Sequence, residues 1–281
     1  MKRLRNILLL LFISINSFGT SQFGDILIWN GDTLALFSNP LESYPEIGKL
    51  KQIIEKQLEK QDRLVNPEKY KSDEYQALWS TACYRGYIAE WIVIGNGIYL
   101  NNIYSCHDDK VKVNLTEVFP DKIVNNKIKA VWLTEDLFIP QGDCLAYSNF
   151  EYNSIYETET ALTVEKGEII NIKKYKNSVK ESSVNTNEII YKNLDWKTFP
   201  EIENEIIQVV VTVQPTETGK FERIVDYYTL NDESQQLEKE NKYSKEALRL
   251  VKLIPEFNVY VRRDKVIELD IFVFFDKMHR N

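Results

Sequence analysis

The chain has 281 residues, of which 43% are hydrophobic and 27% are charged, and its formal net charge is -7. These are ordinary values for a folded globular protein, and the length suffices for one large domain or two ordinary ones. The negative charge argues against a nucleic-acid partner, because phosphate binding needs clustered Lys and Arg, and we find such a cluster only within the first five residues.

The first residues have the layout of a secretory signal peptide, which we place at residues 1–21. Basic residues precede the apolar run from Ile7 to Ile15, and small or polar residues follow it up to a cleavage point between Gly19 and Gln22. The run is shorter than the about 20 apolar residues that span a bilayer, so we expect no stable membrane span after cleavage. We therefore expect the mature protein in the periplasm or secreted, with an uncleaved anchor as the alternative.

Residues 22–175 are expected to form a β-rich domain with one amphipathic helix. Asn30-Gly31 lies between two apolar runs, which is the strongest short-range signal of a hairpin, and Asn96-Gly97 predicts a second hairpin between 87–94 and 98–104. Apolar residues at helical spacing predict a helix over 45–61. Further strands are expected over 127–133, 154–164 and 168–175.

Aromatic residues are frequent in this first domain, among them Trp29, Trp79, Trp91 and Trp132. We expect them to pack in the core rather than to form a binding platform, because large apolar side chains are mostly buried. The segment from Thr81 to Tyr87 is similar to segments of exported proteins from Bacteroidetes-like bacteria that have no assigned activity. That resemblance implies a bacterial envelope setting and no particular chemistry.

Between residues 176 and 192 the composition shifts to Asn, Ser, Lys, Glu and Thr, with few apolar residues. Such a composition is typical of a linker or a long exposed loop. We place this linker at 176–200, as the boundary between the first domain and a second domain at 201–281.

The chain has three cysteines, Cys83, Cys106 and Cys144. Their spacing matches no metal-binding pattern, so we expect no metal site. In an exported protein they allow one intramolecular disulfide, which we expect between Cys83 and Cys106.

The sequence predicts no enzyme and no cofactor. Common catalytic and nucleotide-binding motifs are absent, and side chains of adjacent strand residues such as Cys106 and His107 point to opposite faces. Glu157 and Glu159 lie two residues apart in a predicted strand, where their carboxyls could approach as in a retaining glycosidase. We favour a solvated strand face for this pair, and keep an envelope hydrolase as an alternative.

The last domain is expected to be a small ββαβ module, which makes the whole chain α+β. Strands are predicted over 207–213, 221–230 and 266–275, and a helix over 243–254 that Pro255 ends. Together with the phrase from Ala247 to Phe257, this order resembles the carboxy-terminal domain of the TonB family over residues 206–276.

The resemblance to the TonB family implies recognition by strand addition, in which an extended peptide of an outer-membrane or periplasmic protein pairs with the edge of the last strand. Carried over by position, this edge consists of Val266, Ile267, Glu268, Leu269, Asp270, Ile271, Phe272, Val273 and Phe274. A TonB energy transducer also needs a lasting membrane helix and a Pro-rich spacer, whereas the 8 prolines here are scattered. We therefore expect an exported binding or interaction protein, with a membrane-anchored TonB-type transport component as the alternative.

Overall fold

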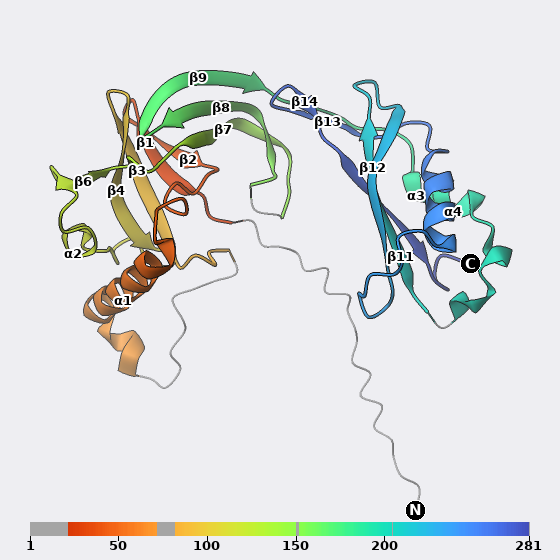
Figure 1. The fold of residues 1–281 in the computed structure, drawn as a ribbon, viewed down its shortest axis with the longest axis horizontal. Helices are drawn as coiled ribbons and strands as arrows, with labels where there is room; N and C mark the ends of the chain where they lie inside the picture. The colour runs from red at the N-terminus through yellow and green to blue at the C-terminus, as the bar shows by residue number, and fades with distance from the viewer. Residues whose placement is uncertain (1–21, 72–81, 150–151, 204, 281) are drawn as a thin grey trace, which may run out of the picture. The chain divides into compact units, whose positions relative to one another are not determined.

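The computed structural model describes residues 22–71, 82–149, 152–203 and 205–280. The chain divides into two compact units, Met1–Lys174 and Tyr175–Asn281, each of which is described by itself (Figure 1). The structure is mixed α+β and rich in strands, as predicted. The predicted signal peptide at 1–21 and Trp79 lie outside the described residues. Among the described helices, none is long and apolar enough to cross a bilayer.

The first unit is built on a sheet with the strand order β2-β1-β3-β4-β9-β8-β7, and β6 pairs with β4 and β5 beside it. Its strands are β1 (Asp25–Trp29), β2 (Asp32–Leu36), β3 (Tyr87–Ile94), β4 (Gly97–Ser105), β5 (Ile123–Val124), β6 (Lys127–Lys129), β7 (Glu135–Ala146), β8 (Ile155–Glu165) and β9 (Glu168–Lys176). The N–H of Phe37 donates to the carbonyl of Phe138 in β7 at 2.8 Å. The two ends of the strand order therefore meet.

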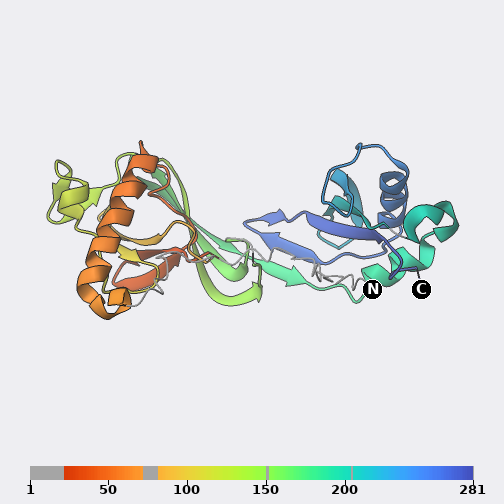
Figure 2. The same cartoon turned by 90° about the horizontal axis from the view of Figure 1, so that it is seen from below.

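The helix α1 (Ile47–Val65) lies across the first unit (Figure 2). Its buried residues Leu50, Ile54 and Leu58 recur at the predicted spacing and pack into the same core as Trp91. Trp91 is fully buried, which confirms core packing for that aromatic residue. The short helices η1 (Pro67–Lys71) and α2 (Leu115–Val118) complete the unit.

The two predicted hairpins are present, but the second turn is shifted by one residue. Asn30 and Gly31 both have positive φ (54° and 89°), as the first turn requires. In the second hairpin Ile94 pairs with Gly97, so Gly95 and Asn96 form the turn. Gly95 supplies the positive φ of 61°, and the prediction that Asn96-Gly97 does so was wrong.

Strand prediction failed between residues 127 and 146. Only Lys127–Lys129 of the predicted strand 127–133 is extended, as β6, and the chain then turns before the long strand β7, which was not predicted. Pro140 and Gly142 lie within β7 and are residues that normally end strands. They are tolerated here beside a register shift between Gln141 and Cys144.

The second unit contains two small sheets, with the strand orders β12-β11-β15 and β10-β13-β14. Its elements are β10 (Ser178–Lys180), α3 (Thr186–Asn193), η2 (Trp196–Thr198), η3 (Pro200–Glu203), β11 (Ile207–Pro215), β12 (Phe221–Leu230), α4 (Lys242–Val251), β13 (Val259–Arg262), β14 (Lys265–Val266) and β15 (Leu269–Phe275). The buried residues Ala247, Leu250 and Val251 of α4 pack with Val209 and Val211 of β11 in one core.

The linker predicted at 176–200 is wrong, because this segment folds as part of the second unit. It forms β10, α3 and η2, and it buries Ile190, Leu194 and Phe199 in the core. Asn185 caps α3 by accepting a hydrogen bond from the N–H of Glu188 (3.2 Å). These few apolar residues all belong to the same core as the buried residues of α4 and β11.

The predicted last strand, 266–275, is divided in two. Val266 pairs with Val261 of β13 in a hairpin that was not predicted, and the last strand begins only at Leu269. Positive φ at Arg263 and Asp264 (54° and 62°) forms the tight turn of this hairpin.

Candidate functional site

One edge of the β12-β11-β15 sheet carries open backbone groups. β15 pairs with β11 along its inner side, whereas the N–H of Phe274 points outward and donates to the hydroxyl of Tyr191 in α3 at 3.1 Å. Alternate residues of a strand direct their backbone groups to the same side, so those of Asp270 and Phe272 point outward as well. Within the described residues they meet no hydrogen-bonding partner.

The open edge is shorter than the predicted one. The N–H of Ile267 donates to the carbonyl of Tyr260 (2.8 Å), and the carbonyl of Val266 accepts from the side chain of Gln214 (3.3 Å). At the other end, Tyr191 already occupies the N–H of Phe274. Of the predicted site, Leu269, Asp270, Ile271, Phe272 and Val273 thus lie on the open strand β15. Glu268 precedes this strand, and Val266, Ile267 and the N–H of Phe274 already have partners.

The two faces of β15 differ as the alternation predicts. Val273 is fully buried under α4, whereas Phe272 on the opposite face is 45% exposed. Phe272 and Tyr228 flank Val210 of β11 in one cross-strand row, and Val210 between them is 1% exposed. An aromatic side chain with exposed surface therefore stands directly beside the open edge.

At the opposite edge of this sheet, the segment from Asn231 to Asn241 covers the end of β12 at Thr229 and Leu230. The N–H of Leu237 donates to the carbonyl of Thr229 (2.9 Å), and Leu230 forms a bridge with Gln236. Lys239 then pairs with Asp226 at 2.6 Å. This segment therefore occupies the outward backbone groups at the Thr229 end of β12.

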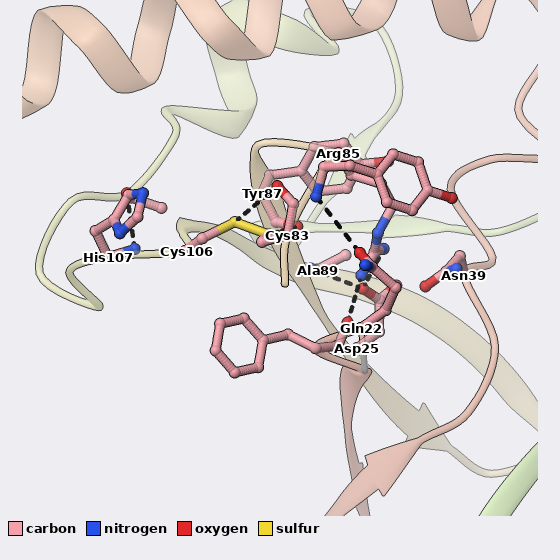
Figure 3. The surroundings of a disulfide bond; sticks show 12 residues. Gln22, Asp25, Asn39, Cys83, Arg85, Tyr87, Ala89, Cys106 and His107 are labelled. Atoms are coloured by element: carbon pink, nitrogen blue, oxygen red, sulfur yellow. Dashed lines mark hydrogen bonds and ion pairs between the residues drawn. A yellow bond between two sulfur atoms is a disulfide. The ribbon is translucent and has the colours of Figure 1, made fainter. Parts of the chain in front are cut away.

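In the first unit, Cys83 and Cys106 form the predicted disulfide (Figure 3). Cys83 precedes β3 and Cys106 follows β4, so the bond joins the two strands at the end of their hairpin, where Tyr87 pairs with Ser105. The remaining cysteine, Cys144, is free and exposed.

Beside the disulfide lies a buried ion pair that the sequence did not reveal. Arg85 donates to Asp25 at 2.8 Å, and Asp25 also accepts from the N–H of Ala89 (3.2 Å) and from the indole of Trp91 (3.0 Å) (Figure 3). Burial lowers the pKa of Arg85, but the carboxylate of Asp25, together with Tyr152 and Tyr87, outweighs this and raises the pKa. The partners are 60 residues apart in sequence, and no local motif marks them.

Among the described residues, the side chains considered for catalysis do not have the arrangement that catalysis would need. Cys106 is in the disulfide, so its thiol does not pair with His107 as a nucleophile. Glu157 is exposed, but Glu159 is only 1% exposed, so the expectation of a solvated face was wrong for Glu159. Within the described ranges no cluster of His, Cys, Asp or Glu has the arrangement of a metal site.

Comparison with protein-family models, with curated proteins and with solved structures found no match for this chain. The resemblance of residues 206–276 to the carboxy-terminal domain of the TonB family stays a prediction, and the candidate site depends on the geometry of β15 itself.

Proposed function

We propose that this chain is an exported interaction protein of the bacterial envelope, whose second unit binds an extended peptide by strand addition to β15. The observation that carries the proposal is the row of open backbone groups at Asp270 and Phe272, beside the exposed ring of Phe272. Strand addition uses backbone groups for affinity and alternate side chains for specificity. The predicted likeness to the TonB carboxy-terminal domain supports the same binding mode.

The disulfide supports the exported setting. A bond such as that between Cys83 and Cys106 persists in oxidising compartments and is rare in the cytosol. The predicted signal peptide at 1–21 leads to the same compartment.

The backbone alone gives a weak complex. Asp270 and Phe272 each offer one N–H and one carbonyl, and a net gain of about 1 kcal/mol per hydrogen bond sums to about 4 kcal/mol. That free energy corresponds to a Kd of about 1 mM. Burial of an apolar peptide side chain against Phe272 adds about 1.5 kcal/mol or more, which is at least about tenfold in affinity.

The proposal is tested with a displayed library of random extended octapeptides selected on the whole protein. We expect selected peptides to protect the amides of Asp270 and Phe272 from hydrogen exchange, because these two N–H groups become strand hydrogen bonds. We also expect an apolar residue at the peptide position that faces Phe272.

Tyr228 provides the matched control, because it lies in the same cross-strand row but on β12, away from the β15 edge. Phe272→Ala should weaken peptide binding about tenfold, whereas Tyr228→Ala should leave it nearly unchanged. Protection of β12 amides instead of β15 amides, together with a larger loss of affinity in Tyr228→Ala than in Phe272→Ala, would overturn the assignment of the binding edge.

A further inference from the structure

The open edge of β15 carries a carboxylate whose charge is not neutralised by another side chain. Asp270 and Phe272 are two residues apart in this strand, so both side chains point to the face of the sheet opposite α4. Asp270 is exposed, and one of its carboxylate oxygens accepts from the hydroxyl of Thr212 in β11 at 2.6 Å. Within the described ranges, this carboxylate forms no ion pair with a Lys, Arg or His side chain.

The neighbouring carboxylates on this face already have cations beside them. Asp226 of β12 lies in the same cross-strand row as Asp270, and Lys239 pairs with it at 2.6 Å. Just before β15, the side chain of Glu268 lies 4.0 Å from that of Arg223. Of these three carboxylates, only that of Asp270 is left to pair with a positive charge on a partner.

The backbone of β15 places a residue of an added strand directly opposite Asp270. β11 pairs antiparallel with both of its neighbours, and antiparallel pairing is slightly more stable per residue than parallel pairing. In an antiparallel strand added to the open edge, the residues opposite Asp270 and Phe272 form hydrogen-bonded pairs with them, with Cα atoms about 5.5 Å apart. Side chains of such cross-strand pairs lie on the same face and contact each other.

The strand direction fixes the order of these two residues in the peptide. An antiparallel strand passes Phe272 first and reaches Asp270 two residues later, because alternate residues of a strand share one face. An apolar residue is already expected opposite Phe272. The residue two positions after it therefore faces the carboxylate of Asp270.

We infer that β15 selects a basic peptide, in which an apolar residue is followed two positions later by Lys or Arg. This inference depends on the proposed strand addition to β15 and names the chemical class of its ligand. The apolar side chain packs on Phe272, and the ammonium or guanidinium group donates to the carboxylate of Asp270. Because the hydroxyl of Thr212 already orients this carboxylate, less side-chain entropy is lost when the cation pairs with it.

Four capped octapeptides built on threonine test this inference with the whole protein. Three carry leucine at position four and lysine, glutamine or glutamate at position six, and the fourth keeps the leucine but carries its lysine at position two. Binding is followed by the NMR shifts of the Asp270 and Phe272 amides. We expect lysine at position six to bind about 2- to 30-fold more tightly than glutamate, with glutamine between them, since opposite charges across strands attract and like charges repel.

The fourth peptide controls for non-specific attraction, because it has the same composition and charge as the lysine peptide. In an antiparallel strand its lysine lies two positions before the leucine and does not face Asp270. We therefore expect it to bind about as weakly as the glutamine peptide.

Variants of the two aspartates assign the preference to one carboxylate. Asp270→Asn keeps an acceptor for Thr212 but removes the charge, and should abolish most of the difference between the lysine and glutamate peptides. Asp270→Lys should reverse the preference. Asp226→Asn is the matched control, since Asp226 lies in the same row but pairs with Lys239, and it should retain the difference.

Two kinds of failure are distinguishable. If the peptides shift the β15 amides but lysine and glutamate bind equally, or if lysine binds equally well at positions two and six, selection of a basic residue is refuted while strand addition stands. An undiminished preference for lysine in Asp270→Asn also refutes it. If none of the peptides shifts the amides of Asp270 and Phe272, strand addition to β15 is refuted, and this inference with it.

Discussion

The two units use their sheets in opposite ways. The first unit brings the ends of its strand order together through Phe37 and Phe138. It secures the β3–β4 hairpin with a disulfide, and a buried ion pair connects Asp25 of β1 to Arg85, just before β3. The second unit covers the end of β12 at one edge of its β12-β11-β15 sheet and leaves the other edge open at Asp270 and Phe272. Pairing by backbone groups is therefore available at the β15 edge of the second unit.

The largest effect is expected from the buried ion pair. Asp25→Ala leaves the guanidinium of Arg85 without its carboxylate in the core, where the two side chains are 0% and 1% exposed. Removal of one partner of such a pair costs about 3 to 5 kcal/mol. Hydrogen exchange followed by mass spectrometry should show this loss in the first unit and unchanged protection in the second.

Asp32 is exposed at the β1–β2 turn and serves as the control for that substitution. Asp32→Ala should change the free energy of unfolding of the first unit by less than about 0.5 kcal/mol. Equal destabilisation of both units by Asp25→Ala would contradict their separation.

Loss of the disulfide is expected to be the next largest effect. Cys83 and Cys106 are 23 residues apart, and a crosslink over that distance stabilises a protein by about 3 kcal/mol, mainly by restricting the unfolded chain. Urea unfolding of the Cys83→Ser/Cys106→Ser variant should show this loss, and a reducing agent should reproduce it in the unmodified protein. Cys144→Ser, which changes the free cysteine, should leave the response to the reducing agent intact.

The smallest effect is expected at Phe274, where the hydroxyl of Tyr191 ends the open edge of β15. Tyr191→Phe keeps the ring that stacks on His279 but removes the hydroxyl that accepts from the N–H of Phe274. We expect a loss of about 1 kcal/mol in the second unit and faster exchange of the Phe274 amide. Tyr228→Phe, on the same sheet, should leave that amide unchanged, and equal exchange rates in both variants would mean that Tyr191 does not limit the edge.

Where local chemistry decides the structure, the sequence was informative. Asn30-Gly31 predicted its hairpin because positive φ is intrinsic to those residues, and the spacing of Leu50, Ile54 and Leu58 predicted α1. The pairing of Cys83 with Cys106 and the alternation of Phe272 and Val273 were also predicted correctly. Each of these features depends on neighbours in sequence or on a very small set of candidates.

Long-range packing decided the features that were missed. Polar composition suggested a linker before β11, although Asn185 and Glu188 already form a helix-capping pattern that would have indicated α3. Tyr191 limits the open edge through a contact 83 residues away, and no local pattern reveals such a contact. The same holds for Glu90, because its hydrogen-bonding partners come close to it only when the β3–β4 hairpin forms.

The segment from Asn231 to Asn241, which covers the end of β12, also limits how strands can pair with that edge. A sheet with two open edges accepts a strand on each side and can polymerise, as in amyloid. Here Leu237 and Lys239 hold a short charged segment against the end of β12, so a further strand cannot pair with that edge at Thr229 and Leu230. A strand added along β12 would therefore have to stop short of Thr229, whereas the edge of β15 is open at Asp270 and Phe272.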